Sequence, residues 1–279
     1  MGDTVRLIDA TGQEHRPFRG DARIVSLVPS LTELACALGL AGSLVGRTGF
    51  CIHPRDTVRS IHKVGGTKDV DLERVRALAP THLLVNVDEN EKPAVDALRP
   101  HVGSVVVTHP IDVEDNIGLY RLFGGIFGCE ARAGGLEARL RAALDAARAE
   151  AHAPLRVLYL IWRNPWMTVG PATYIARMLA EAGMQAVAPE STARYPQVDL
   201  DAFGAERFDA VLLSTEPYRF TEEHRRALLA DPRLAGRPVC LIDGEMTSWY
   251  GSRAIDGIEY LRAFRRELDL ARAAEGVST

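Results

Sequence analysis

The feature that most limits the possible folds of this chain is a long helical pattern near its middle, within residues 129–152. Apolar residues recur there at steps of three and four from Leu136 to Ala147, and charged residues fill most other positions, as in an amphipathic helix. Gly134 and Gly135 indicate that the helix begins or bends there, and Pro154 ends it. One interpretation is a surface helix of a single large domain. Because strands and helices alternate on both sides, we favour a helix that connects two lobes.

Composition describes an ordinary water-soluble chain with enough apolar residues for a sizeable core. Of its 279 residues, 47% are hydrophobic and 25% are charged, which suits one large or two modest domains. The net charge of −4 gives no basic surface for nucleic acid. No apolar run approaches the roughly 20 residues needed to span a bilayer. We therefore expect neither nucleic-acid binding nor membrane insertion.

The start of the chain and its cysteines bear on location. The first 22 residues contain no apolar signal core, so the sequence as written predicts a cytoplasmic protein, or a periplasmic one if it has been trimmed. Its four cysteines form no CxxC pair, and in a reducing compartment they behave as small hydrophobic residues.

Strand and helix patterns alternate along most of the chain. Such alternation is typical of parallel sheets that are covered by helices on both faces. We expect a leading hairpin at 5–16, a helix start at Ser30 with Glu33 in capping-box spacing, and a cap at Thr221. The predicted strands are 23–28, 45–50, 82–87, 103–108, 156–161, 210–214 and 239–242; the predicted helices are 71–79, 92–98, 172–182, 198–205, 221–230 and 252–268. Residues 113–127 precede the central helix.

A weak internal repeat supports two similar lobes. Residues 71–87 align without gaps on residues 199–215, with the same order of Asp-Leu, a second acidic residue, a short helix and a strand. The predicted fold class is α/β, with two doubly wound lobes of mostly parallel sheets joined by one long central helix. The predicted segments are an N-terminal lobe at 1–128, a connecting helix at 129–153 and a C-terminal lobe at 154–279.

Two stretches carry a resemblance to a known family. RIVSLVPSLTELACALGLAGSLVGRT, followed by VGGTKDVDLERVRALAPTHLLV, resembles the substrate-binding proteins for cobalamin and iron–siderophore complexes, and most closely their cobalamin-binding branch. The resemblance extends over nearly the whole chain. It implies two α/β lobes joined by a helix, a ligand clasped between them, and delivery to an ABC-transporter permease. In that family one acidic residue on each lobe docks against permease arginines; Glu73 and Asp201 match those positions, and the repeat pairs them too.

Candidate ligand residues come from the loops that follow strands, because open α/β sheets hold ligands at the carboxyl ends of their strands. All three tryptophans of the chain fall in the second half of this set. Stacked aromatic rings suit a broad, flat, partly polar ligand such as a tetrapyrrole. For Ser30, helix capping is the competing interpretation, and for each tryptophan it is packing against a sheet. The candidates are Ser30, Phe50, Cys51, His53, Thr67, Glu89, Trp162, Asn164, Trp166, Tyr195, Glu216, Tyr218, Glu245, Trp249 and Tyr250.

Metal ligation and catalysis are weaker hypotheses. Cys51 and His53 are residue types that bind metals, but two residues do not complete a site. Asp243, Glu245 and His53 could serve as acids or bases, yet no nucleophile motif or phosphate loop accompanies them. We therefore predict a non-catalytic, monomeric binding protein that needs no cofactor and takes cobalamin or another metal chelate as its ligand. The alternative is a cytosolic enzyme or cofactor carrier of the same fold that acts on a metal–tetrapyrrole.

Overall fold

The structure is a computed structural model that describes residues 6–234 and 236–276. The chain divides into two compact units. Unit 1 consists of Met1–Pro110, Glu114–Leu140 and Tyr250–Arg253, and unit 2 consists of Ile111–Val113, Arg141–Trp249 and Ala254–Thr279. The division differs from the predicted segments in three ways: it cuts the central helix between residues 140 and 141, it assigns residues 250–253 to unit 1, and it assigns residues 111–113 to unit 2.

Unit 1 contains a parallel sheet of five strands in the order β5-β4-β3-β6-β7. A separate antiparallel hairpin pairs β1 with β2, as the sequence predicted, although Val5, where the hairpin was expected to begin, lies outside the described residues. The strands are β1 (Leu7–Ile8), β2 (Glu14–His15), β3 (Ile24–Ser26), β4 (Leu44–Arg47), β5 (His62–Lys63), β6 (His82–Asn86) and β7 (Ser104–Thr108).

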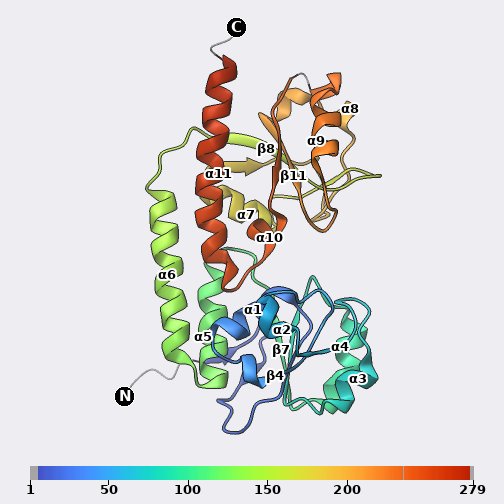
Figure 1. Ribbon diagram of the computed structural model, residues 1–279, viewed down its shortest axis with the longest axis vertical. Coiled ribbons are helices and arrows are strands. Elements are labelled where there is room, and N and C mark those ends of the chain that lie inside the picture. Colours follow the sequence, from blue (N-terminus) through green and yellow to red (C-terminus); the bar gives the residue numbers. More distant parts are fainter. Residues whose placement is uncertain (1–5, 235, 277–279) are drawn as a thin grey trace. The chain divides into compact units, whose positions relative to one another are not determined.

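Helices cover both faces of this sheet. Val25, Leu83 and Val105 pack with Val75 and Leu98 in one core cluster. These two residues come from α3 and α4, which lie side by side (Figure 1). Alternate strand residues face the opposite way and are buried as well. The helical elements are α1 (Pro29–Ala37), η1 (Ala41–Ser43), α2 (Arg55–Val58), α3 (Leu72–Ala77), α4 (Lys92–Leu98), η2 (Arg99–His101) and α5 (Asp115–Phe127).

Unit 2 repeats this plan with a sheet in the order β10-β8-β11-β12, all parallel, to which β9 adds an antiparallel pairing with β8. Leu158, Val211 and Leu213 face a core cluster that includes Phe203 from α8 and Leu228 from α9. Figure 1 shows these two helices on one side of β11. The strands are β8 (Leu155–Trp162), β9 (Met167–Thr168), β10 (Met184–Ala186), β11 (Ala210–Ser214) and β12 (Val239–Ile242).

The helices of unit 2 follow the predicted order. Thr221 caps α9 as expected and forms a capping box with His224. The helical elements are α7 (Tyr174–Glu181), α8 (Leu200–Phe203), η3 (Ala205–Arg207), α9 (Glu222–Leu229), η4 (Pro232–Leu234), α10 (Gly244–Ser248) and α11 (Arg253–Gly276). The predicted fold class, two α/β halves with mostly parallel sheets, is confirmed.

The central helix, α6 (Glu130–Arg148), lies within the predicted connecting segment 129–153 but ends several residues before Pro154. It runs through Gly134 and Gly135 without a break, so the prediction of a start or bend there was wrong. A helical glycine costs about 1 kcal/mol relative to alanine, and packing offsets that cost: Ala133 and Leu136 are buried on either side of the pair. In unit 1, a Cβ on Gly124 of α5 would lie 2.8 Å from the Ala133 Cβ, so glycine at this position lets α5 and α6 pack closely.

The internal repeat is real at the level of structure. Asp71 is the N-cap of α3 and accepts a hydrogen bond from the Arg74 backbone, while Asp199 is the N-cap of α8 and accepts from Asp201 and Ala202. The strands that follow, β6 and β11, occupy equivalent places, since each pairs with the first strand of its parallel sheet. Two matching sequence segments therefore build matching parts of the two units.

Candidate functional site

In each unit the strand order reverses beside its first parallel strand. In unit 1 this occurs between β3 and β6, and in unit 2 between β8 and β11. The helices that follow two such strands leave on opposite faces, so the loops at their carboxyl ends separate and leave room for a ligand. The sequence candidates Ser30 and Glu89 follow this pair of strands in unit 1. In unit 2 Trp162 is the last residue of β8, and Asn164, Glu216 and Tyr218 follow the pair.

Exposed apolar side chains gather in the loops at these carboxyl ends. Among the described residues, eight large apolar side chains are exposed; four of them lie in loops that follow parallel strands, and a fifth, Trp162, is the last residue of β8. The sequence analysis missed two of the five, Ile52 and Val87, because the sequence does not show whether an isolated aliphatic residue in a loop is exposed or buried. The five are Phe50 (63% exposed), Ile52 (46%), Val87 (50%), Trp162 (41%) and Tyr195 (38%).

Ser30 lies in the first turn of α1 but does not cap it. The N-cap is Val28, which offers no side-chain acceptor, so the predicted capping box of Ser30 and Glu33 was wrong. The Ser30 hydroxyl is buried, and its interaction with the Tyr250 phenol acts to lower the pKa of that phenol. Glu33 instead accepts two hydrogen bonds, of 2.8 and 2.7 Å, from Arg253.

The three candidates in the loop after β4 differ in their exposure to solvent. Phe50 is the most exposed of the three, and His53 is half-buried. Cys51 is fully buried, and its Sγ lies 3.1 Å from the hydroxyl oxygens of both Thr32 and Thr48. Burial raises the pKa of this thiol. Cys51 therefore packs as a small core residue, which is the role that the sequence gave to the cysteines in general.

The buried side-chain amide of Asn90 holds the loops around Thr67 together through hydrogen bonds. The Asn90 side chain donates to the carbonyl oxygens of Leu27 at 3.2 Å and Thr67 at 2.9 Å, and it accepts from the Asn86 backbone. It thereby ties together segments that follow β3, β5 and β6. The sequence showed Asn90 only as part of an acidic loop, so its positioning role was missed.

Glu89 and Tyr250 form a pair in unit 1. The Tyr250 hydroxyl donates to Glu89 Oε1 at 2.9 Å. Burial and the nearby Glu89 carboxylate raise the pKa of the Tyr250 phenol well above its usual value, so the phenol stays protonated. Residues 250–253 are far from residue 89 in the sequence, and only the fold brings the two candidates together.

The aromatic candidates of unit 2 divide between surface and core. Trp162 is exposed and meets Tyr218 edge-to-face, with ring centroids 5.5 Å apart. Trp166 instead stacks on Phe220, with centroids 6.0 Å apart and planes at 9°, and it packs against the core cluster. The Arg163 guanidinium lies over the Trp166 ring, 5.7 Å from its centroid. Trp166 thus has a packing role in addition to any contact with a ligand.

Glu216 and Trp249 are also joined. Glu216 Oε1 accepts from the Trp249 indole and from the Ser248 hydroxyl, both at 2.8 Å. Burial raises the pKa of Glu216 despite these two donors, and the charges of Glu245 and Asp243 act in the same direction. A half-buried carboxyl group that resists ionisation can offer a hydrogen bond to a ligand as well as accept one.

The remaining candidates are placed as follows. Glu245 is half-buried in the first turn of α10, while Asn164 is exposed and has a left-handed backbone with φ of 59°. Glu73 and Asp201 occupy the same position in α3 and α8, two residues after the N-cap. Both carboxylates are exposed, and each already has an arginine partner, Glu73 with Arg76 at 2.5 Å and Asp201 with Arg233 at 3.3 Å.

A metal site receives no support from the geometry. In the described part of the chain, no group of three or more His, Cys, Asp or Glu side chains is arranged to hold a metal ion. Burial raises the pKa of Cys51 and favours its thiol form, although the hydrogen bonds of Thr32 and Thr48 act in the opposite direction, whereas metal binding requires a thiolate. The pairing of Cys51 with His53 stays a prediction.

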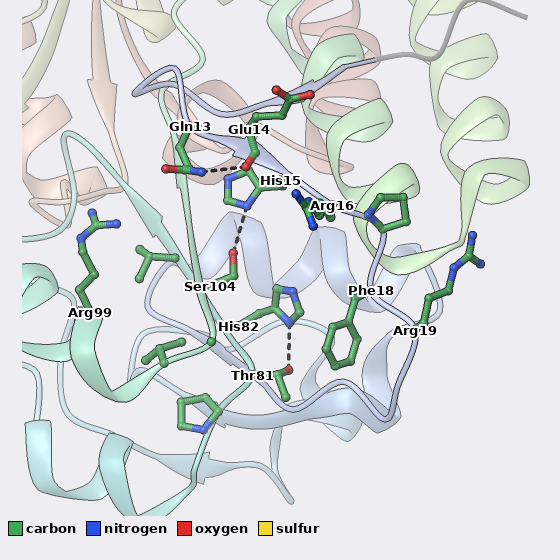
Figure 2. A pocket seen from close by; sticks show the side chains of 15 residues that line it. Gln13, Glu14, His15, Arg16, Phe18, Arg19, Thr81, His82, Arg99 and Ser104 are labelled. Carbon is green, nitrogen blue, oxygen red and sulfur yellow. Dashed lines mark hydrogen bonds between the residues drawn. The ribbon is translucent and has the colours of Figure 1, made fainter.

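A separate hollow of about 690 Å³ opens at the other end of the unit 1 sheet, beside the amino ends of β6 and β7 (Figure 2). None of the predicted site residues lines it. His15 lies 3.0 Å from Ser104 Oγ through Nδ1 and 3.1 Å from Asp9 Oδ2 through Nε2. Asp9 also accepts from the backbones of Thr11 and Val107. These bonds anchor the β1–β2 hairpin to β7.

The sequence profile of the family described as "Periplasmic binding protein" matches residues 24–238. Two curated relatives are similar over shorter lengths. The uncharacterized ABC transporter substrate-binding lipoprotein YvrC of Bacillus subtilis is 34% identical over 95 residues, 34% of this chain and 29% of that protein. The vitamin B12-binding protein of Pectobacterium atrosepticum is 23% identical over 198 residues, 68% of this chain and 71% of that protein.

Solved structures share the fold over most of the chain. The periplasmic vitamin B12 binding protein BtuF of Vibrio cholerae superposes with a TM-score of 0.74 at 18% identity, over 88% of this chain and 97% of that one. A periplasmic heme binding protein from Pseudomonas aeruginosa gives a TM-score of 0.74 at 25% identity, over 87% and 91% of the two chains. No helix in the described residues is long and apolar enough to cross a membrane.

These findings confirm the resemblance that the sequence showed. Proteins of this family bind solutes and are not enzymes, so the alternative of a catalyst on the same scaffold is not favoured. The chain belongs to the periplasmic binding protein family, and it is a ligand-binding protein of the ABC-transporter substrate-binding type.

Proposed function

We propose that the protein binds a flat metal chelate of the tetrapyrrole class, a corrinoid or a heme, through the loops at the carboxyl ends of its strands. The observation that carries this proposal is that each unit by itself leaves apolar side chains exposed at the carboxyl ends of its strands, above all Phe50 in unit 1 and Trp162 in unit 2. Large apolar surfaces left in water at a sheet edge are typical of a binding site. The similarity to vitamin B12-binding and heme-binding proteins supports the same ligand class.

Polar groups beside these apolar side chains would fix the orientation of the ligand. In unit 1 these are the buried Ser30 hydroxyl and the Tyr250 phenol beside it, and in unit 2 it is the Glu216 carboxyl group, which is hydrogen-bonded to Trp249. Neither Ser30 nor Glu216 is a nucleophile with an adjacent base, so the chelate would be held and released unchanged. The chelate is cargo in this proposal, and the protein needs no resident cofactor.

The test is a titration of the purified full-length chain with cyanocobalamin and with hemin, followed by absorbance and tryptophan fluorescence. We expect one of the two to bind at a stoichiometry of one and to be recovered intact after denaturation. Failure of both chelates to bind a protein whose circular dichroism shows a folded α/β chain would contradict the proposal. Recovery of a chemically altered chelate would contradict the non-catalytic role.

We further propose that Glu73 and Asp201 dock on an ABC permease. Their support is positional: each carboxylate is exposed and lies two residues after the N-cap of the matching helix in its unit. Their partners Arg76 and Arg233 would have to be exchanged for permease arginines. Such exposed pairs are worth only about 0–1 kcal/mol, so this exchange has a low cost.

Measuring ligand uptake through a permease alongside chelate affinity distinguishes the docking proposal from the ligand-binding proposal. Glu73→Ala and Asp201→Ala should each reduce ligand uptake through a reconstituted permease while leaving chelate affinity unchanged. Glu206→Ala is a matched control because Glu206 is another exposed acid of unit 2. Equal uptake by all three variants would argue against docking through these acids.

Location and assembly are also proposals. The relatives are described as periplasmic proteins or lipoproteins, and they give no support to the cytoplasmic location predicted from the first residues. We propose an extracytoplasmic location and a monomer. Cell fractionation with an antibody against the chain, together with light scattering of the purified protein, tests both.

A further inference from the structure

Cys36 and Cys51 belong to different elements of unit 1, and both lie at the same face of helix α1. Cys36 lies in α1, and Cys51 lies in the loop that follows β4. The Cys51 thiol reaches α1 at Thr32, whose Oγ1 is 3.1 Å from the Cys51 Sγ. The position of Thr32 therefore shows which part of α1 Cys51 contacts.

Cys36 lies on the same face of α1 as Thr32. It follows Thr32 by four residues, so the two side chains lie one above the other on one helix face. Long and short side chains of a helix lean toward its N-terminus and cover the preceding turn, which brings the Cys36 thiol back toward Thr32 and the Cys51 Sγ. Consistent with this, burial, Glu33 and the charge of Cys51 together raise the pKa of Cys36 to about 11.

We propose that Cys36 and Cys51 form an intramolecular disulfide when the protein meets a disulfide oxidant. With oxidised glutathione, the thiolate of half-buried Cys36 attacks one glutathione sulfur and releases reduced glutathione. The Cys51 thiolate then displaces the second glutathione from Cys36. Each protein thiol loses one proton, the two sulfurs are oxidised to the disulfide, and one oxidised glutathione is reduced to two thiols.

The surroundings of the pair predict a structural disulfide that is hard to reduce. Low-pKa thiols stabilise the reduced form of a pair and make its disulfide oxidising, whereas the pKa values of both Cys36 and Cys51 are raised. Few thiolates are present at neutral pH, so formation in the folded protein should be slow. Oxidation during folding should be faster because both thiols are then accessible.

The bond would also restrain the loop that carries exposed apolar side chains. Phe50 and Ile52 flank Cys51 directly, and both are exposed. At present Cys51 is held by hydrogen bonds to Thr32 and Thr48. A covalent link to α1 would hold the same loop against the helix whether or not a ligand is bound.

The experiment is a count of free thiols in the full-length chain before and after exposure to oxidised glutathione. It is carried out on the folded protein and again during refolding from urea, with alkylation and peptide mapping. None of the four cysteines is disulfide-bonded in the structure. We expect two free thiols to be lost after refolding, one cross-linked peptide pair containing residues 36 and 51, and a higher melting temperature than the reduced protein.

Single variants make the outcome specific. Cys36→Ser should abolish the cross-link at a half-buried position, and Cys51→Ser should do the same, whereas Cys129→Ser and Cys240→Ser should leave it intact. Four free thiols after both treatments would overturn the proposal. So would a cross-link that maps to Cys129 or Cys240, or one that joins two chains.

Discussion

The indole nitrogen of Trp249 donates a hydrogen bond to Glu216 Oε1 over 2.8 Å, which makes a buried tryptophan the direct neighbour of a carboxyl group with a raised pKa. Trp249 belongs to unit 2, and the next residue, Tyr250, belongs to unit 1. Tyr250 donates to Glu89 in its own unit. Two consecutive aromatic residues thus each hold a glutamate that follows an equivalent strand, β11 or β6.

Glu216→Gln should stabilise the protein at neutral pH. Because the folded state raises the pKa of Glu216 above its ordinary value of 4.5, the folded protein binds the proton more tightly than the unfolded chain, and stability is lost as pH rises through that pKa. The glutamine can still accept from Ser248 and Trp249. Urea denaturation of both proteins at pH 4 and pH 7 should show a difference only at pH 7; an equal difference at both pH values would contradict this account.

Trp162→Ala should weaken binding of the chelate by roughly 1–3 kcal/mol, the range for a large anchor residue, with little change in stability. Trp162 is 41% exposed, so its removal leaves no core cavity. Leu229→Ala is a matched control, because Leu229 is 43% exposed but lies in α9 away from the strand-end loops. Affinity comes from fluorescence or absorbance titration, and equal losses in the two variants would remove Trp162 from the site.

Trp166→Ala should behave differently and should destabilise unit 2. Its ring stacks on Phe220 and packs against the core cluster, and truncation of a packed tryptophan typically costs about 3–5 kcal/mol, with the lower end expected for a half-buried one. The midpoint of urea denaturation is the measurement. An unchanged midpoint with lost affinity would assign Trp166 to the ligand alone.

Acid should destabilise unit 1 through His82. Burial lowers the pKa of His82 to about 4, and the nearby His15 acts in the same direction, so the folded state prefers the neutral ring. Stability is complete above the unfolded pKa near 6.5 and is lost as pH falls toward about 4, by roughly 2 kcal/mol. His82→Phe keeps the edge-to-face contacts with Phe18 and Phe127 and should show a smaller loss between pH 7 and pH 4.

Two consecutive arginines of α11 should differ sharply in their contribution. Arg265 is 1% exposed and donates to the carbonyl oxygens of Gly183 at 2.7 Å and Ala153 at 2.6 Å. Arg265→Ala leaves both carbonyls and Asp269 without this donor and should cost about 3 kcal/mol or more. Arg266 is exposed and pairs with Glu150, so Arg266→Ala should cost less than about 1 kcal/mol. Similar losses would contradict the burial-based distinction.

The sequence alone determined the order and kind of most elements. Apolar runs bounded by turn residues placed β6, β11 and β12 within a residue or two, because a strand buried on both faces needs such a run wherever it lies. The helix at 92–98 matched α4 at both ends. The repeat also placed Asp71 and Asp199 in equivalent turns, since N-capping depends only on the neighbouring backbone.

Tertiary structure alone decided what each candidate side chain touches. Cys51 is buried against Thr32, Trp166 is stacked on Phe220, and Tyr250 reaches Glu89 across 161 residues of sequence. The same local patterns would fit an exposed cysteine and a solvent-facing tryptophan. Periodicity reports which way a residue points along its own element, whereas burial, pKa and hydrogen-bond partners depend on segments brought alongside it from elsewhere in the chain.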